Sequence, residues 1–113
     1  SEEDKEMTKE YLNNPYTPDE EVHWDFISLA MRSVADTCII PVQDYLGLGK
    51  EARINTPSTL GGNWVYRLPK KAFDAAKIRK IRRMTEIFAR LPKVQKEAEE
   101  EKETEVTTDT KER

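Results

Sequence analysis

Hydrophobic residues recur with a helical period at the start of the chain. Ser1 can cap a helix, acidic residues follow it, and the apolar stripe is narrow: Met7, Tyr11 and Leu12. A short helix is therefore expected over residues 1–12, ended by the turn-forming run Asn13-Asn14-Pro15.

A longer amphipathic pattern predicts a second helix over residues 18–34. Thr17 can cap it, Pro18 suits the first helical position, and Glu20 stands at the spacing of a capping box. The apolar arc is wide, so the helix must be covered on more than one side. Its members are Val22, Trp24, Phe26, Ile27, Leu29, Met31 and Val34.

A short β-branched run over residues 37–42 has no alternation of polar and apolar positions. This pattern is typical of a strand buried on both faces, as in a parallel sheet. Ile39 is accordingly expected in the core, and Pro41 fits only if it lies at the end of the strand.

Residues 43–68 show neither period and predict a long loop, which in a compact domain is usually functional. Pro69 then opens a helix that runs to about Leu91, before Pro92. The order is helix, buried strand, long loop, helix. A single parallel strand has no partner, so the pattern indicates part of a larger α/β protein or a domain that needs another chain.

Composition divides the chain into three parts. Charged residues make up 36% of it, and the net charge is −3. We assign residues 1–16 to a helix and linker, residues 17–92 to the structured segment, and residues 93–113 to a charged tail. The tail has almost no large apolar residues, so we expect it to be disordered or loosely helical.

Candidate metal, cofactor and membrane features are few. Cys38 is the only cysteine, which excludes an intrachain disulfide and weakly favours a reducing compartment. His23 is the only histidine, expected in solvent, and neither a metal site nor a cofactor is predicted. No secretory signal is visible at the acidic start, and every apolar run is too short to span a bilayer.

Two adjoining motifs carry a family resemblance. Residues 41–57 read P-V-Q-D-Y-L-G-L-G-K-E-A-R-I-N-T-P, and residues 62–67 read G-N-W-V-Y-R. Together they resemble the C-terminal signature of the 4-alpha-glucanotransferases, or amylomaltases. This chain departs from the usual residues at Ile54, often Met in the family, at Ser58, usually Gly, and at Tyr66, usually Trp.

The resemblance implies a fold and an activity. It implies an α/β chain that forms the C-terminal part of a (β/α)₈ TIM barrel, with strand eight between helices seven and eight. A whole barrel needs about 250 residues, so the chain would be incomplete without the N-terminal barrel portion. The implied cytoplasmic enzyme transfers alpha-1,4-glucan segments between maltodextrins with retention of configuration.

The family's catalytic carboxylates do not map onto this chain. The opening, Ser1-Glu2-Glu3-Asp4-Lys5, resembles the segment that follows the family's T-H-D motif, which holds the last of them. No catalytic residue is therefore assigned, and the chain alone is expected to be inactive, as a fragment of a larger enzyme.

The resemblance implies a glucan contact at Asn55, and we add Asp44 and Pro57 as candidate substrate-binding residues. An amide suits a sugar because it donates and accepts hydrogen bonds without charge. Asn55 could instead be a turn residue ahead of Pro57, and Asp44 could cap a turn or pair with Arg53. For Arg53 an ion pair with Glu51 or Asp44 is favoured.

Two other features have competing interpretations. Trp64 and Tyr66 could stack on sugar rings, but sealing the end of a barrel is favoured for them. The basic residues 70–90 could make the chain a small helical module for an acidic partner or nucleic acid. A solvated outer helix of the barrel is favoured, without nucleic-acid or membrane partners, and a vestigial fragment without activity is a third possibility.

Overall fold

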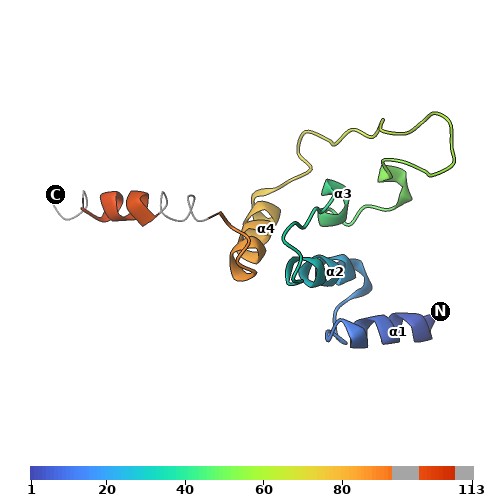
Figure 1. Ribbon diagram of the computed structural model, residues 1–113, viewed down its shortest axis with the longest axis horizontal. Coiled ribbons are helices and arrows are strands. Elements are labelled where there is room, and N and C mark those ends of the chain that lie inside the picture. Colours follow the sequence, from blue (N-terminus) through green and yellow to red (C-terminus); the bar gives the residue numbers. More distant parts are fainter. Residues whose placement is uncertain (93–99, 109–113) are drawn as a thin grey trace.

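The computed structural model describes residues 1–92 and 100–108, and its regular elements are all helical (Figure 1). In chain order these elements are α1 (Glu2–Tyr11), the 3₁₀ turn η1 (Asp19–Glu21), α2 (Val22–Met31), α3 (Val42–Tyr45), η2 (Lys50–Ala52) and α4 (Ala75–Ile87). Residues 100–108, inside the predicted tail, are also helical. The disorder predicted for the rest of the tail falls on residues 93–99 and 109–113, outside the described ranges.

The strand expected over residues 37–42 does not form. These residues are irregular up to Pro41, and α3 begins at Val42. A parallel strand persists only when a neighbouring strand takes up its backbone N–H and C=O groups, and the described residues contain no strand at all. Ile39 is 86% exposed, so its expected place in the core is also wrong for this chain.

The first helix is confirmed, together with the signals that bound it. The Asp4 amide donates to Ser1 Oγ at 3.1 Å, and the Ser1 ammonium donates back to the Asp4 carboxylate at 2.9 Å. At the other end Asn13 adopts a left-handed conformation with φ 58°. The amides of Asn13 and Asn14 then bond to carbonyls of the last turn, which is a Schellman motif.

The second and third predicted helices are present but shorter than predicted. The pattern over residues 18–34 becomes η1 followed by α2, and the Thr17–Glu20 capping box does not form. The predicted start at Pro69 shifts to Ala75 because Asp74 is the N-cap of α4 and accepts a hydrogen bond from the Lys77 amide at 2.7 Å. That bond, followed by the one from the Lys77 ammonium, lowers the pKa of Asp74.

The core lies around α2, which packs against η1, α3 and α4. Its buried members are Ile27 and Met31 of α2 and Met84 of α4. Partly buried side chains surround them: Trp24, Cys38, Ile40, Tyr45 and Phe88. The Lys80 ammonium lies 4.1 Å from the centre of the Trp24 ring, a cation–π contact that also joins α4 to α2.

A single arginine ties the end of α4 to the end of α2. The Arg90 guanidinium donates to the carbonyl of Met31, the last residue of α2, at 2.6 Å. It also donates to three carbonyls of the turn that follows, in Ala35 at 2.9 Å, Ser33 at 3.3 Å and Asp36 at 3.4 Å. A cation at this position also opposes the partial negative charge at the C-terminal end of α2.

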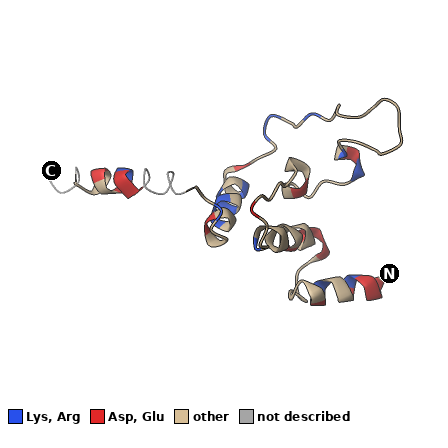
Figure 2. Cartoon of the chain, in the orientation of Figure 1, with Lys and Arg blue, Asp and Glu red and all other residues tan. Residues whose placement is uncertain are grey.

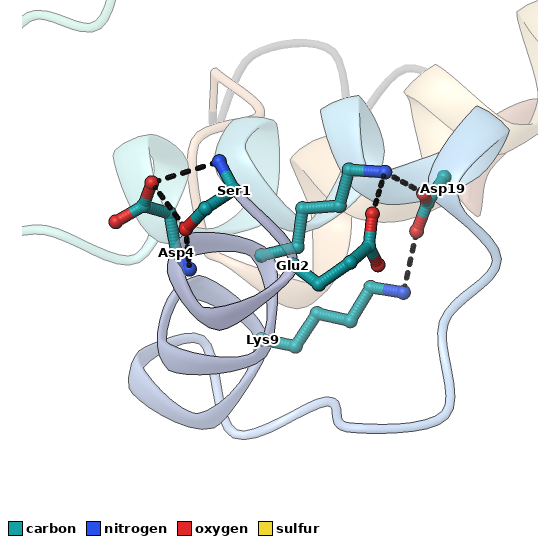
Figure 3. A network of polar contacts seen from close by, with 6 residues as sticks. Ser1, Glu2, Asp4, Lys9 and Asp19 are labelled. Atoms are coloured by element: carbon teal, nitrogen blue, oxygen red, sulfur yellow. Dashed lines mark hydrogen bonds and ion pairs between the residues drawn. The ribbon is translucent and has the colours of Figure 1, made fainter.

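Helix α1 is joined to the rest of the chain by charge (Figure 3). The Asp19 carboxylate receives the ammonium groups of Lys9 at 2.6 Å and Lys5 at 3.1 Å, both from α1. The hydrogen bond from Lys9, and then that from Lys5, lowers the pKa of Asp19. The contacts with Glu2 and Asp19 raise the pKa of Lys5.

The chain is extended and leaves much of its apolar surface uncovered. Its radius of gyration is 19.0 Å, whereas a compact domain of this length would have about 13 Å. Buried hydrophobic residues in the described ranges are few: Leu12, Ile27, Met31, Ala52 and Met84. Tyr16, Val34 and Leu60, among others, are almost fully exposed. Such a small core can offset little of the conformational entropy that is lost on folding.

We expect the isolated chain to lack a sharp, cooperative thermal transition. Its helices would lose circular dichroism at 222 nm gradually on heating, because few buried contacts couple them. Light scattering recorded in the same ramp would show association through the exposed apolar residues. A steep melt of a monomeric species would contradict this expectation.

Arg90→Ala should loosen the contact between α2 and α4. Without their donor, these carbonyls should destabilise the packing of α2 against α4 by about 1–3 kcal/mol. Amide hydrogen exchange in both helices should therefore accelerate about five- to hundredfold. Arg83→Ala is the matched control, because Arg83 is exposed and bonds to Glu86 of its own helix. Equal acceleration in the two variants would show that the arginine bridge does not hold the helices together.

The contact between α1 and Asp19 should be sensitive to acid. The pKa of Asp19 is lowered from 3.8, so its contribution is complete above that pH and disappears as the pH falls through the lower native pKa. Carboxyl carbon shifts followed by NMR would give this titration. Asp19→Asn should release α1 at all pH values. A native Asp19 that titrates at or above 3.8 would contradict the assignment.

Candidate functional site

The three candidate substrate-binding residues lie around one surface depression. Asp44 from α3, and Asn55 and Pro57 from the following loop, line a hollow of about 400 Å³. The rest of its lining consists of Pro41, Gln43, Leu48, Gly49, Lys50, Ala52, Arg53 and Ile54. The floor therefore comes from α3, η2 and the beginning of the long loop, which are consecutive in the chain (Figure 1).

The two short helical turns are fixed to each other by Gln43. Its side-chain amide donates to the carbonyl of Ala52 at 3.2 Å, and Ala52 is buried. Glu51 fixes η2 from the other side, since its carboxylate accepts from the Gly49 amide at 2.8 Å. Backbone hydrogen bonds from Glu51 itself and from Gly49 lower the pKa of this carboxyl. Gln43 and Glu51 thus hold the frame of the depression.

The start of the loop is anchored through its backbone. Arg53 Nε donates to the carbonyl of Asn55 at 2.7 Å. The favoured ion pair of Arg53 with Glu51 or Asp44 is wrong, because neither pair forms in the part of the chain that the structure describes. The arginine instead fixes the peptide that carries the Asn55 side chain.

Asn63 closes the same loop from its far end. Its Oδ1 accepts from the Thr56 amide at 2.8 Å, and its Nδ2 donates to Thr59 Oγ1 at 3.2 Å. The Trp64 amide donates to the carbonyl of Ile54 at 2.6 Å. This role of Asn63 could not be predicted from the second motif, to which it belongs, because a side-chain bond across seven residues has no local sequence signal.

The depression presents polar side chains that a ligand could contact. Asp44 and Asn55 are exposed, and neither side chain has a hydrogen-bond partner within the described ranges. The suggestion that Asp44 caps a turn or pairs with Arg53 is therefore not realised. Asp44 is the only carboxylate among the lining residues, and Lys50 and Arg53 are the only cations. Double displacement at a sugar requires two carboxyl groups about 5 Å apart, so the described lining of this hollow lacks the groups for that reaction.

The aromatic residues of the second motif do not seal a core in this chain. Trp64 is 76% exposed and has a left-handed backbone with φ 62°, while Tyr66 is half-buried. Residues with a side chain rarely adopt this conformation, and here the bond from the Trp64 amide to Ile54 helps to maintain it. The indole is left available on the surface.

His23 is half-buried rather than solvated, which corrects the expectation for it. Its ring packs against Gly47, where an added Cβ would lie 2.9 Å from His23 Cε1. Gly47 also has φ 64° and ends α3. His23 lines a second hollow, of about 550 Å³, which shares Asp44 with the first. No group of three or more potential metal ligands occurs within residues 1–92 and 100–108.

Many cations of the basic segment are engaged within the chain. Lys77 pairs with Asp74, while Arg82 and Arg83 pair with Glu86. Figure 2 shows these basic residues along α4 next to acidic ones. Among the helices that the structure describes, none is long and apolar enough to cross a membrane.

Comparison with known proteins identifies the family. The family model described as 4-alpha-glucanotransferase matches residues 1–74. The 4-alpha-glucanotransferase of Clostridium butyricum is 43% identical over 90 residues, which are 80% of this chain and 18% of that protein. The chloroplastic or amyloplastic 4-alpha-glucanotransferase of Arabidopsis thaliana is 38% identical over 79% of this chain and 16% of its own length.

The Thermus thermophilus enzyme of the same name is 41% identical over 67% of this chain and 15% of its own length. No solved structure matches the chain significantly. The chain thus spans less than a fifth of these relatives. Because the family model covers well over half of its residues, the chain belongs to the 4-alpha-glucanotransferase family.

Proposed function

We propose that this chain forms one wall of the glucan cleft of a 4-alpha-glucanotransferase. The whole enzyme would transfer alpha-1,4-glucan segments between maltodextrins with retention of configuration. The observation that carries the proposal is the depression that gathers Asp44, Asn55 and Pro57. In it the Asn55 amide would bond to sugar hydroxyls, the Asp44 carboxylate would accept from them, and the Pro57 ring would lie against the sugar.

The chemistry of the hollow supports a role in binding. Its single carboxylate cannot serve as both nucleophile and acid/base, so the catalytic carboxylates would come from elsewhere in the enzyme. A bound sugar held at several hydroxyls is oriented for attack, and such positioning is itself a large part of catalysis. The contribution of this chain would therefore appear as affinity and alignment.

We further propose that the chain occupies the C-terminal part of a TIM barrel in the whole enzyme. The exposed side chain of Ile39 and the irregular backbone before Pro41 support this, because both would be satisfied by flanking strands. The chain matches less than a fifth of each named relative, which leaves ample sequence for those strands. A cytoplasmic location stays a prediction, since the named plant relative is plastidial.

The test is to insert the full chain in place of the matched segment of the Clostridium butyricum enzyme. We expect the chimaera to disproportionate maltotriose and Asn55→Ala to lower kcat/KM by a few-fold to tenfold. One lost hydrogen bond to a neutral sugar costs about 0.5–1.5 kcal/mol. The melting temperature should stay nearly unchanged, because the Asn55 side chain is exposed and has no hydrogen-bond partner among the described residues.

Two controls accompany this measurement. Ile27→Ala removes a side chain that is 4% exposed and should destabilise the chimaera by about 2–5 kcal/mol, which lowers its melting temperature. The chain by itself should release no glucose from maltotriose. Full activity of Asn55→Ala, or a loss of stability matching that of Ile27→Ala, would show that Asn55 is structural. Salt-sensitive RNA binding by the chain would favour the basic-module interpretation instead.

A further inference from the structure

The peptide unit between Asn55 and Thr56 is held by two side chains, those of Arg53 and Asn63. Arg53 Nε bonds to the carbonyl of Asn55 at 2.7 Å, and Asn63 Oδ1 accepts from the amide of Thr56 at 2.8 Å. These two bonds act on the same peptide unit, because the Asn55 carbonyl and the Thr56 amide belong to one planar group. Its orientation decides where the Asn55 side chain points.

The Asn63 side chain uses both ends of its amide. While Oδ1 receives Thr56, Nδ2 donates to Thr59 Oγ1 at 3.2 Å, and the Thr59 hydroxyl donates to the carbonyl of Thr56 at 2.6 Å. Thr56 is thus bonded at its N–H and at its C=O within a single ring of contacts. An amide supplies an acceptor and donors on two separate atoms of one short side chain.

The residues between the two ends of the loop provide little else to fix it. Gly61 and Gly62 have positive φ values, and nothing lies within 4 Å of where their Cβ atoms would be. Leu60 is fully exposed. Within the described residues, the hydrogen bonds that hold residues 54–64 are therefore the ring around Asn63, the bond from Trp64 to Ile54 and the bond from Arg53 to Asn55.

We propose that Asn63 is a positioning residue for sugar binding, which acts through Asn55. This inference rests on the proposed function, in which Asn55 contacts the glucan. Asn63 itself does not line the depression. It orients the peptide between Asn55 and Thr56 before the sugar arrives, so less conformational freedom is lost on binding.

The first test examines the loop without using activity. Hydrogen exchange of the Thr56 amide is followed by NMR in the full chain. Asn63→Ala should accelerate it at least several-fold, whereas Asn63→Asp keeps the acceptor and should accelerate it less. Ser58→Ala is the matched control, because it removes a hydroxyl in the same loop that has no hydrogen-bond partner within the described ranges. Unchanged exchange in Asn63→Ala would overturn the proposal.

The second test uses the chimaera and a double-mutant cycle. Asn63→Ala should lower kcat/KM by a few-fold to tenfold. The loss should lie in the same constant, kcat or KM, that Asn55→Ala changes. The kcat/KM of the double variant should be within about twofold of that of the less active single variant, because both substitutions remove the same contact. Asn63→Asp should recover most of the loss, and Ser58→Ala should behave as the parent.

The outcomes separate this inference from the function on which it rests. If Asn55→Ala lowers kcat/KM but Asn63→Ala does not, the positioning role is wrong and the glucan contact stands. If the two losses multiply in the double variant, Asn63 acts independently of Asn55 and the inference fails. If Asn55→Ala has no effect, the proposed contact fails and the inference fails with it, even where Asn63→Ala accelerates exchange at Thr56.

Discussion

The arrangement of the chain depends on the guanidinium of Arg90. The packing of α2 against α4 joins segments far apart in the sequence, and the apolar cluster between them is small. Arg90 adds hydrogen bonds to the carbonyls where α2 ends, the groups that a helix cannot satisfy by itself. Charge-assisted bonds of this kind are among the stronger polar contacts in proteins. They hold the end of α2, and α2 in turn supports α3 and the candidate site.

A structural feature could be predicted from the sequence where the contact that determines it is between residues close together in the chain. Ser1 caps the start of α1 and Asn13 terminates its end, as their residue types indicate. Gly47 ends α3 with the positive φ that glycine favours. The turn that directs Arg90 toward α2 uses Ala89 with φ 56°, and alanine gives no signal for this conformation. Thr17 had the right spacing for a cap, yet the helix starts later without it. Helices were therefore predictable, and their ends only in part.

The expected strand shows the limit of local reasoning most clearly. The β-branched run through Ile39 has strand propensity. A strand nevertheless needs a neighbouring strand for its backbone hydrogen bonds, and the described residues contain none. The members of the candidate site, Asp44, Asn55 and Pro57, were chosen from a motif that resembles a family signature, and their role in binding stays a prediction. The contacts that bring them together could not be predicted, because the bond of Gln43 to Ala52 and that of Asn63 to Thr56 depend on how the loop folds.

The candidate site separates the groups that hold its shape from the groups that would meet the ligand. Gln43, Glu51, Arg53 and Asn63 direct their polar atoms to backbone groups of the same segment. In the part of the chain that the structure describes, the side chains of Asp44 and Asn55 have no such partner and are exposed. A neutral sugar replaces water at such groups with little electrostatic gain, so affinity must come from hydroxyls that meet donors and acceptors already in place. A rigid backbone beneath free polar side chains would meet that requirement, so the residues that hold the backbone would matter as much as those that contact the sugar.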